Sequence, residues 1–337
     1  MLTIYNTLPA GLLETEAADL HQLLPGPSLI HLPGRIEQPL FVSVLLHGNE
    51  VTGWQTMQQV LRRYQDKPLP RALSLFIGNI AAARHGMRCL DGQPDYNRIW
   101  KGEGDGPEAV MVRQVMEEVR QRQPFACVDI HNNTGRNPHY ACINRLSPDF
   151  MSLASLFSRT VVYFRKPDAV LSMAFSELCP AVTIECGRPG EPHGVEHAAE
   201  FIDACLHLSS YPAHGVAAHD IDLFHTVAVV KVPPHLSIGV EGDVADLCLP
   251  AEIDHLNFRE LVPGTVLGFL KEGTINGALA VTNEAGEDVG ERYFNVEQST
   301  IKTRTAVMPS MLTMDTKIIR QDCLCYLMER LETQANA

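Results

Sequence analysis

Three His-x-x-Glu pairs in this sequence place an imidazole and a carboxylate three residues apart, a spacing that lets both side chains reach one zinc ion: His47–Glu50, His193–Glu196 and His197–Glu200. The first pair directly follows the apolar run 39–46, which predicts a buried strand, and it opens a segment predicted to be helical. The carboxyl ends of strands are where an open α/β sheet presents its ligand-binding residues. His47 and Glu50 are therefore the first candidate metal ligands.

A third ligand is expected from the end of another strand. His131 stands in that position, because it directly follows the apolar run 125–130. Two histidines and one carboxylate, with the fourth position left to water, form a ligand set of catalytic zinc hydrolases. Asp129 points to the other side of the strand or supports a ligand, and we do not expect it to be a fourth ligand. The pattern predicts one zinc ion per chain.

A competing metal motif lies further along the chain. The string His193-Gly-Val-Glu-His197 matches the His-x-x-Glu-His motif of inverted zinc peptidases, in which both histidines lie within one helix. Pro192 and Gly194 predict that His193 lies at or before the helix start, which disfavours this alternative. A solvated helix N-terminus is the other interpretation of residues 193–200.

The elements that position these residues alternate between short apolar runs and helix-like segments. Strands are predicted at 39–46, 73–78, 125–130, 160–164 and 181–185, and helices at about 50–64, 107–122 and 196–209. Near-continuous apolar strands are typical of a sheet that is covered on both faces. The prediction is an α/β fold with helices on both faces of the sheet.

The pattern changes after residue 212. Short β-rich runs at 226–232 and 278–282 are separated by Gly, Pro and Asn-Glu-Ala-Gly turns. Apolar residues with helical spacing over about 315–331 predict a closing helix. We therefore expect two domains: an α/β catalytic domain over 1–212, and a smaller β-rich C-terminal domain with a terminal helix over 213–337.

Composition limits the class of partner. The 337 residues carry 27 Lys+Arg against 40 Asp+Glu, for a net charge of −13, which argues against broad nucleic-acid binding but not against a small anionic substrate. No stretch approaches 18 uninterrupted apolar residues, so no membrane span is expected. The nine cysteines include no Cys-x-x-Cys pair, and no secretory signal is apparent, so we expect a cytoplasmic protein.

Four motifs follow one another over about 140 residues: His47-Gly-Asn-Glu50, the run from Asn79 through Asp95-Tyr-Asn97-Arg98, Asp129-Ile-His131-Asn-Asn-Thr134, and Thr183-Ile-Glu185-Cys-Gly187. In this order they resemble the succinylglutamate desuccinylase/aspartoacylase family, a branch of the zinc carboxypeptidase superfamily. The β-rich segment after residue 210 is similar to that family's layout. The resemblance implies a mixed, zinc carboxypeptidase-like sheet.

The resemblance also implies roles for individual residues. His47, Glu50 and His131 would hold the zinc ion, whose bound water is the nucleophile, and Glu185 would act as general base and acid. Arg88 would polarise the scissile carbonyl, and Asn97 and Arg98 would bind the α-carboxylate of the substrate. A guanidinium suits both tasks, because it stabilises a developing oxyanion and offers a planar fork to a carboxylate.

Some assignments stay open. Without the family, the better interpretation of Arg98 is a salt bridge to Asp95. Further arginines stand beside the motifs, any one of which could bind a second acid group of the substrate or serve only as a surface residue: Arg84, Arg136, Arg165 and Arg188. The family tends to place a C-terminal tyrosine near its substrate, and Tyr293 is the candidate here.

The implied activity is zinc-dependent hydrolysis of the amide bond of a small anionic N-acyl amino acid. One alternative is a carboxypeptidase with the same metal centre that acts on short peptides. A second is a non-catalytic zinc-binding ligand sensor, which the intact set of ligands, base and arginine disfavours. A homo-oligomer is a further hypothesis that comes from the family alone.

Overall fold

The computed structural model describes residues 1–212, 214–271 and 278–332, which form two compact units. Unit 1 comprises Met1–Asn132 and His139–Asp222, and unit 2 comprises Asn133–Pro138 and Leu223–Glu332. The sequence-based boundary at 212/213 lies ahead of strand β9 (Asp222–Lys231), at whose first residues the second unit begins. The short segment 133–138 comes from the first half of the chain but belongs to unit 2.

The strands of unit 1 form a sheet in the order β1-β2-β4-β3-β5-β8-β6-β7. Their bounds are β1 (Thr3–Tyr5), β2 (Ser28–Leu32), β3 (Gly34–Val44), β4 (Leu69–Ile77), β5 (Ala126–His131), β6 (Tyr140–Ile143), β7 (Thr160–Tyr163) and β8 (Ala181–Glu185). The central strands β4, β3, β5 and β8 are parallel, while β2 pairs antiparallel with β4 and β6 antiparallel with β8. The predicted mixed sheet is confirmed.

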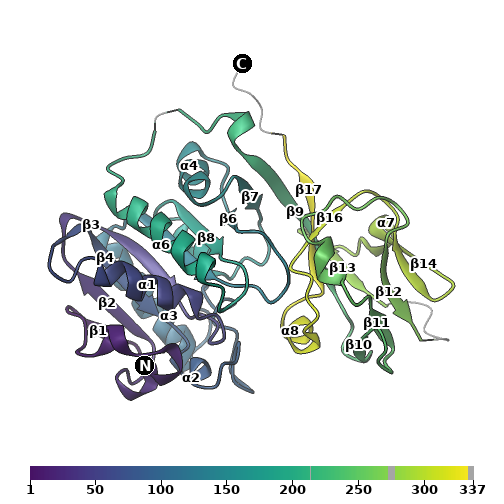
Figure 1. The fold of residues 1–337 in the computed structure, drawn as a ribbon, viewed down its shortest axis with the longest axis horizontal. Coiled ribbons are helices and arrows are strands. Elements are labelled where there is room, and N and C mark those ends of the chain that lie inside the picture. The colour runs from purple at the N-terminus through teal and green to yellow at the C-terminus, as the bar shows by residue number, and fades with distance from the viewer. Residues whose placement is uncertain (213, 272–277, 333–337) are drawn as a thin grey trace. The chain divides into compact units, whose positions relative to one another are not determined.

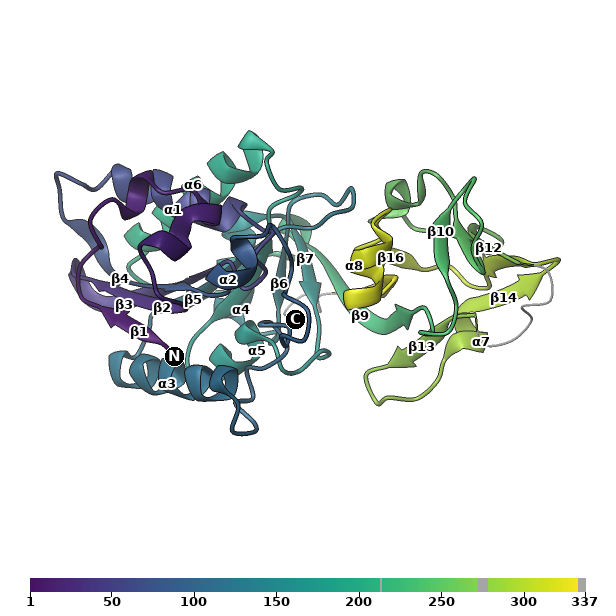
Figure 2. The same ribbon diagram turned by 90° about the horizontal axis from the view of Figure 1, so that it is seen from below.

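Helices cover both faces of this sheet. Figure 2 shows α1 (Thr52–Arg62) and α6 (Pro192–His207) on one face and α3 (Pro107–Arg122) on the other. Shorter helical segments complete unit 1: α2 (Ile80–Ala83), α4 (Pro148–Phe157), α5 (Leu171–Phe175), and the 3₁₀ turns Leu12–Glu14, Ala17–Gln22 and Ala218–Asp220. This arrangement explains the continuous apolar character of the central strands, since a strand with both faces covered needs no polar side.

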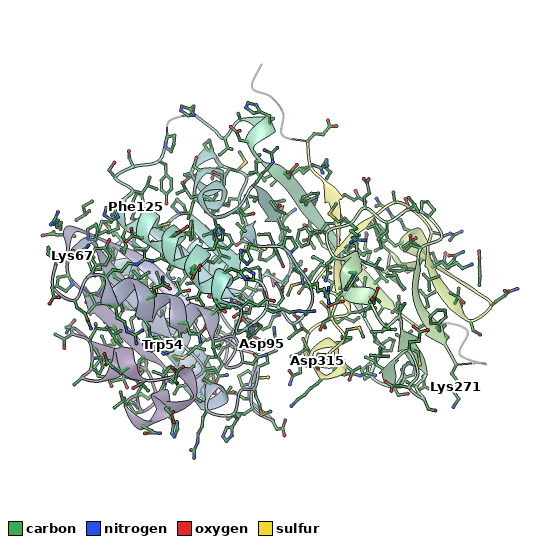
Figure 3. The ribbon with its side chains drawn as sticks, in the orientation of Figure 1. Trp54, Lys67, Asp95, Phe125, Lys271 and Asp315 are labelled. Carbon is green, nitrogen blue, oxygen red and sulfur yellow. The ribbon has the colours of Figure 1, made fainter. Side chains whose placement is uncertain are left out.

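The burial of individual residues follows these layers. Every residue of β5 is buried, as are Leu40 to Val44 of β3, so the two strands on which the metal motif depends are rigidly packed. Trp54 of α1 is fully buried within unit 1, whereas Lys67, beyond the end of that helix, is exposed (Figure 3).

The helix predicted at 107–122 is confirmed as α3, but the one predicted at about 196–209 begins earlier. Helix α6 starts at Pro192, so His193 lies within its first turn and the prediction that it lies at or before the helix start is wrong. Proline at the first helical position lacks only an N–H that would have no helical partner, and its fixed φ suits the helix.

Unit 2 is built from β-strands. β9 pairs antiparallel with β13 (Ala280–Asn283) and with β17 (Cys325–Arg330), which in turn pairs with β16 (Met308–Ser310). A second sheet has the order β10-β11-β12-β15-β14, with bounds Ile238–Val240, Leu247–Leu249, Val266–Leu270, Thr300–Thr303 and Phe294–Glu297. Short helical segments lie at Ile253–Leu256, Gly290–Tyr293 (α7) and Thr316–Gln321 (α8). The predicted smaller β-rich part is confirmed.

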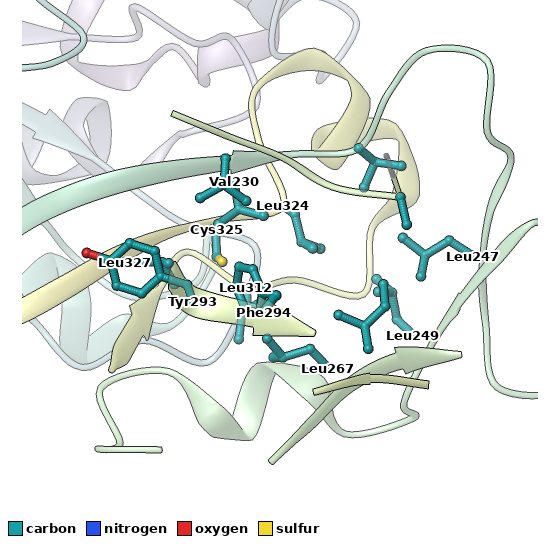
Figure 4. Close-up of a cluster of buried hydrophobic side chains, with 14 of the residues drawn as sticks. Val230, Leu247, Leu249, Leu267, Tyr293, Phe294, Leu312, Leu324, Cys325 and Leu327 are labelled. Atoms are coloured by element: carbon teal, nitrogen blue, oxygen red, sulfur yellow. The ribbon is translucent and has the colours of Figure 1, made fainter. Parts of the chain in front are cut away.

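The core of unit 2 lies among these elements (Figure 4). Apolar side chains from both sheets meet in it, among them Val230, Leu247, Leu312 and Leu327, each at most 2% exposed. Unit 2 therefore buries an apolar core of its own, as an independently packed domain does.

The prediction of a helix over about 315–331 is wrong for the second half of that range. Helix α8 ends at Gln321, and residues 325–330 form strand β17. Asp315, labelled in Figure 3, accepts hydrogen bonds from the backbone of Lys317 and Ile318 and so caps the short helix. Cys325 pairs with Val230 of β9, and this pairing, which local sequence does not reveal, overrides the helical spacing of the apolar residues.

Candidate functional site

The candidate residues of unit 1 follow the carboxyl ends of three adjacent parallel strands. His47 and Glu50 come after β3, His131 ends β5, and Glu185 ends β8. β3 pairs with β5 and β5 pairs with β8, each in parallel. The carboxyl ends of parallel strands meet at one edge of a sheet, where ligand sites of open α/β folds form.

A tight turn after β3 carries His47 and Glu50. The backbone N–H of Glu50 donates to the carbonyl of His47 at 3.1 Å, and Gly48 donates to the carbonyl of Arg88 at 3.2 Å. A Cβ on Gly48 would lie 2.2 Å from the backbone nitrogen of Ala83, far closer than real Cβ atoms come to other atoms. Glycine at 48 is thus required by the close approach of helix α2 to the turn.

His47, Glu50 and His131 converge as the sequence-based ligand set requires. His47 Nδ1 lies 2.8 Å from one carboxylate oxygen of Glu50, and His131 Nδ1 lies 2.7 Å from the other. Their ligand atoms are all within 4.8 Å of one another, and the three side chains are buried. Two imidazole nitrogens and a carboxylate so arranged fit a zinc ion.

Each histidine turns its other ring nitrogen toward a second carboxylate. His47 Nε2 lies 3.0 Å from Asp95 and His131 Nε2 lies 2.9 Å from Asp129. An ionised carboxylate only accepts hydrogen bonds, so Nε2 donates to it in each pair. The rings are therefore held with Nδ1 toward Glu50, an arrangement that is typical of histidines that bind a metal through one nitrogen.

Charge governs the protonation of this cluster. Burial opposes ionisation of Glu50, but His47 and His131 outweigh it and hold the pKa of that carboxyl below its ordinary value. Burial alone would lower the pKa of His131, yet Asp129 and Glu50 raise it well above its ordinary value. Burial likewise opposes ionisation of Asp95, and His47 followed by Arg88 lowers its pKa. Glu50 and Asp95 therefore stay ionised at neutral pH.

Asp95 connects residues of several motifs. One of its oxygens contacts His47 and accepts the backbone N–H of Asn97 at 2.7 Å, and the other accepts Arg88 Nη2 at 2.9 Å. The buried Arg88 guanidinium also lies 3.8 Å from Glu50. The sequence analysis gave Asp95 no role beyond a salt bridge to Arg98 and so missed this contact to a metal ligand and to the candidate oxyanion group.

Asn97 and Arg98 lie against the same cluster. The side chain of Asn97 is buried, with Nδ2 3.3 Å from His131 Nε2 and Oδ1 accepting the backbone N–H of Leu171 at 3.0 Å. Arg98 Nη1 donates to the carbonyl of Asn97 at 2.9 Å, and its charge contributes, after His47 and Arg88, to the lowered pKa of Asp95. Arg98 is thus close enough to Asp95 to interact with it.

Glu185 is flanked on both sides within the sheet. His131 of β5 is its registered partner on one side, and Tyr140 of β6 is its partner on the other. Tyr140 is buried and was missed because β6 was not predicted, although the apolar run 140–143 has the composition of a strand. Gly187, two residues beyond Glu185, has φ 72°, a conformation that favours glycine.

The tyrosine and the arginines that the sequence analysis named as possible substrate contacts lie in the core of unit 2 or at the surface of their units. Tyr293 is 1% exposed in the core of unit 2, where its hydroxyl lies 3.3 Å from Glu329 (Figure 4). Arg84 and Arg165 have exposed side chains in unit 1, and Arg136 has one in unit 2. The structure thus surrounds Tyr293 with protein and leaves these three arginines at the surface of their units.

The histidines of the competing motif do not join the convergent set. His193 and His197 both lie in α6, and His193 Nε2 lies 3.5 Å from Glu191. Among the described residues, His47, Glu50 and His131 are the three whose candidate ligand atoms lie close together.

Comparison with known proteins gives the fold and the site a context. The profile of the succinylglutamate desuccinylase/aspartoacylase catalytic domain matches residues 38–209, about half of the chain. The chain belongs to this family. The matched segment contains the strand ends with His47, Glu50, His131 and Glu185. No curated protein sequence matches this chain significantly.

Solved structures of the family have a similar fold. Succinylglutamate desuccinylase from Chromobacterium violaceum is 14% identical with a TM-score of 0.58, covering 89% of this chain and 86% of its own. The desuccinylase/aspartoacylase from Rhodobacter sphaeroides is 11% identical, with a TM-score of 0.59 and coverages of 90% and 88%. Murine aminoacylase 3 is 13% identical, with a TM-score of 0.54 and coverages of 88% and 96%. At these identities the likeness concerns the fold.

A separate search of the described helices shows that none is both long and apolar enough to span a bilayer.

Proposed function

We propose that this protein is a zinc-dependent amidohydrolase that cleaves the amide bond of a small anionic N-acyl amino acid. The observation that carries the proposal is the convergence of His47, Glu50 and His131 beside Glu185 at the carboxyl edge of the sheet. Zinc at such a set acts as a Lewis acid and lowers the pKa of water at its open position to about 7, which supplies a nucleophile at neutral pH.

Glu185 is the proposed general base and acid. Its registered position beside His131 puts a carboxylate next to the metal ligands, at the end of a buried strand. It would accept a proton from the attacking water and deliver it to the departing amine nitrogen. A positioned group of this kind typically contributes about 10²–10⁴-fold to the rate.

Arg88 is the proposed electrophilic residue. Asp95 holds its guanidinium, which also lies 3.8 Å from Glu50. A positive group held next to the ligands stabilises the negative charge that the carbonyl oxygen gains in the transition state, and losing one such donor costs about 10²–10³-fold in kcat.

Asn97 and Arg98 are the proposed binders of the α-carboxylate of the substrate. The two residues follow Asp95, and the hydrogen bond from Arg98 to the carbonyl of Asn97 holds them together. An amide N–H and a guanidinium are suitable donors to a carboxylate. The local positive charge offsets the net charge of −13, which by itself would repel an anion.

The names of the neighbours support the substrate class. Succinylglutamate desuccinylase and aminoacylase are names of enzymes that act on N-acyl amino acids, and both kinds have the fold of this chain. The substrate panel below distinguishes the acyl group and the amino acid.

The deciding experiment combines metal analysis with a substrate panel. The purified protein would be analysed for bound metal, and amine release would be measured from N-succinyl, N-acetyl and longer N-acyl amino acids beside short peptides. We expect one zinc ion at the proposed centre and turnover of at least one N-acyl amino acid. Turnover of peptides alone would identify a carboxypeptidase, and zinc binding without any turnover would identify a sensor.

A further inference from the structure

Asn132, the residue directly after His131, is buried and forms hydrogen bonds with three separate parts of unit 1. Its backbone N–H donates to Oε2 of Glu50 at 3.2 Å, and its side-chain oxygen accepts the backbone N–H of Thr52 at 3.2 Å. Its Nδ2 donates to the carbonyl of Gly187 at 2.9 Å. The buried amide thus uses both its acceptor and its donor. None of the roles proposed above falls to this residue.

The bond to Thr52 caps helix α1. Thr52 is the first residue of that helix, and Val51, which precedes it, has no side-chain oxygen that could accept a helical N–H. The acceptor comes instead from Asn132, which is 80 residues further along the chain. Glu50 lies in the turn that leads into α1, and the same residue also holds its carboxylate. The turn that carries two proposed ligands is thus fastened to the end of β5.

The bond to Gly187 holds the backbone just after the proposed general base. Glu185 ends β8, and pairing with β5 continues one residue further, where the N–H of Cys186 donates to the carbonyl of His131 at 2.9 Å. The chain then turns at Gly187, whose φ is 72°, and the Asn132 amide donates to the carbonyl of this glycine. The bond therefore anchors the point at which the chain leaves the sheet.

We propose that Asn132 is a positioning residue, which sets the Glu185 carboxylate relative to the turn that carries His47 and Glu50. The inference rests on the proposed function, because it concerns the accuracy with which Glu185 meets the water and the amine. A proton carrier must lie within about 2.6–3.2 Å of the group that it serves. Misplacement by about 1 Å can cost about 10²-fold in rate. An amide bonded to both elements limits such a shift.

The two side-chain links can be broken separately. Asn132→Asp keeps an oxygen that accepts the N–H of Thr52, and a carboxylate suits the positive end of α1, but it cannot donate to the carbonyl of Gly187. Asn132→Ala removes both links and leaves the backbone N–H that Glu50 accepts. The two variants therefore distinguish the cap on α1 from the anchor after β8.

Asn144 offers a matched control in the same unit. It is buried, and its Nδ2 also donates to a backbone carbonyl, that of Phe164, at 3.2 Å. It follows the end of β6 that pairs with Val182, whereas Glu185 pairs with the other end of that strand. Asn144→Asp thus removes the same kind of bond away from the proposed site.

Hydrogen exchange of the full-length protein in the presence of Zn²⁺ tests the links without an assay of activity. In Asn132→Ala we expect the amides of 50–54 and 186–191 to exchange about tenfold faster than in the wild type, because local opening becomes easier. In Asn132→Asp the acceleration should be confined to 186–191. Asn144→Asp should change neither segment, and α3 should exchange equally in all of these proteins. Unchanged exchange of 186–191, or an equal acceleration in α3, in both Asn132 variants would overturn the inference.

The kinetic test is a double-mutant cycle between Asn132 and Glu185. We expect Asn132→Asp to lower kcat about 10²-fold with zinc retained and KM little changed, and Asn144→Asp to leave kcat unchanged. With Glu185→Gln already present, Asn132→Asp should lower kcat further by less than about threefold, because the two residues act as one unit. An equal loss in both backgrounds would overturn the positioning role. If the wild type turns over no substrate, the proposed function fails, and the exchange rates still decide whether Asn132 holds the segment after Glu185.

Discussion

Glu185 and His131 are registered partners on the adjacent parallel strands β8 and β5. Neighbouring strands are about 4.8 Å apart, and paired residues project from the same face of a sheet. The proposed proton carrier and a proposed metal ligand are thus held beside each other by backbone hydrogen bonds, not by a flexible loop. Rigid elements hold a catalytic group more accurately than loops do.

Glu185→Gln should retain zinc and lose about 10²–10⁴-fold in kcat, because the amide keeps the shape of the side chain but cannot accept the proton. Zinc content and initial rates of amine release check this. Loss of the metal instead would mean that Glu185 is itself a ligand.

His131→Ala should lose zinc from the first centre and also destabilise the metal-free protein. Its removal leaves the buried carboxylates of Glu50 and Asp129 without their 2.7 Å and 2.9 Å partner. Breaking a buried charged pair by removing one member typically costs about 3–5 kcal/mol. Denaturant unfolding of the metal-free wild type and variant measures this cost. An unchanged midpoint together with full zinc content would refute the ligand assignment.

Asp95→Asn should weaken zinc binding and slow turnover together, because one carboxylate supports both His47 and Arg88. Loss of such a supporting carboxylate typically costs about 10–100-fold in metal affinity. Competition with a chelator measures the affinity, and assays at saturating zinc separate the effect on Arg88. If kcat recovers fully at saturating zinc, Asp95 acts on His47 alone.

Gly48→Ala should disrupt the first centre without touching a ligand, because the new methyl group would lie 2.2 Å from the backbone of Ala83. We expect a lower melting temperature and reduced zinc content. Gly215→Ala is the matched control, since a Cβ there meets nothing within 4 Å and its φ is not positive. Equal melting temperatures in the two variants would contradict the close approach.

Because of His31, the free energy of unfolding should fall on mild acidification. Burial, followed by the charge of Arg122, lowers the pKa of His31 from 6.5 to about 4. As the pH falls from 6.5 toward 4, the unfolded chain takes up a proton at this residue that the folded chain does not, so folding is disfavoured; above 6.5 the contribution is constant. The drop in melting temperature between pH 7 and pH 5 should therefore be smaller in His31→Gln than in the wild type. Equal drops would show that His31 titrates normally when folded.

Much of unit 1 was predictable because its strands are short, buried and apolar, and the residues that do chemistry follow them directly. Helix α3 coincides with the predicted 107–122, and β8 with 181–185. Strand β6 was missed although its residues have the composition of a strand. The strand character of residues 325–330 was not predictable, because Cys325 acquires its structure from a partner on β9. Local propensity carries no information about such long-range pairing.

The sequence by itself determined the kinds of residue present, their order and the strand ends that carry them: His47 and Glu50, His131, and Glu185. Only the tertiary structure decided that β5 and β8 are neighbours in register, that Asp95 joins His47 to Arg88, and that His139 stacks on His193 and His197. The physical reason is that spacing along a chain governs local geometry, whereas contacts between distant segments depend on how the sheet is ordered and how its helices pack.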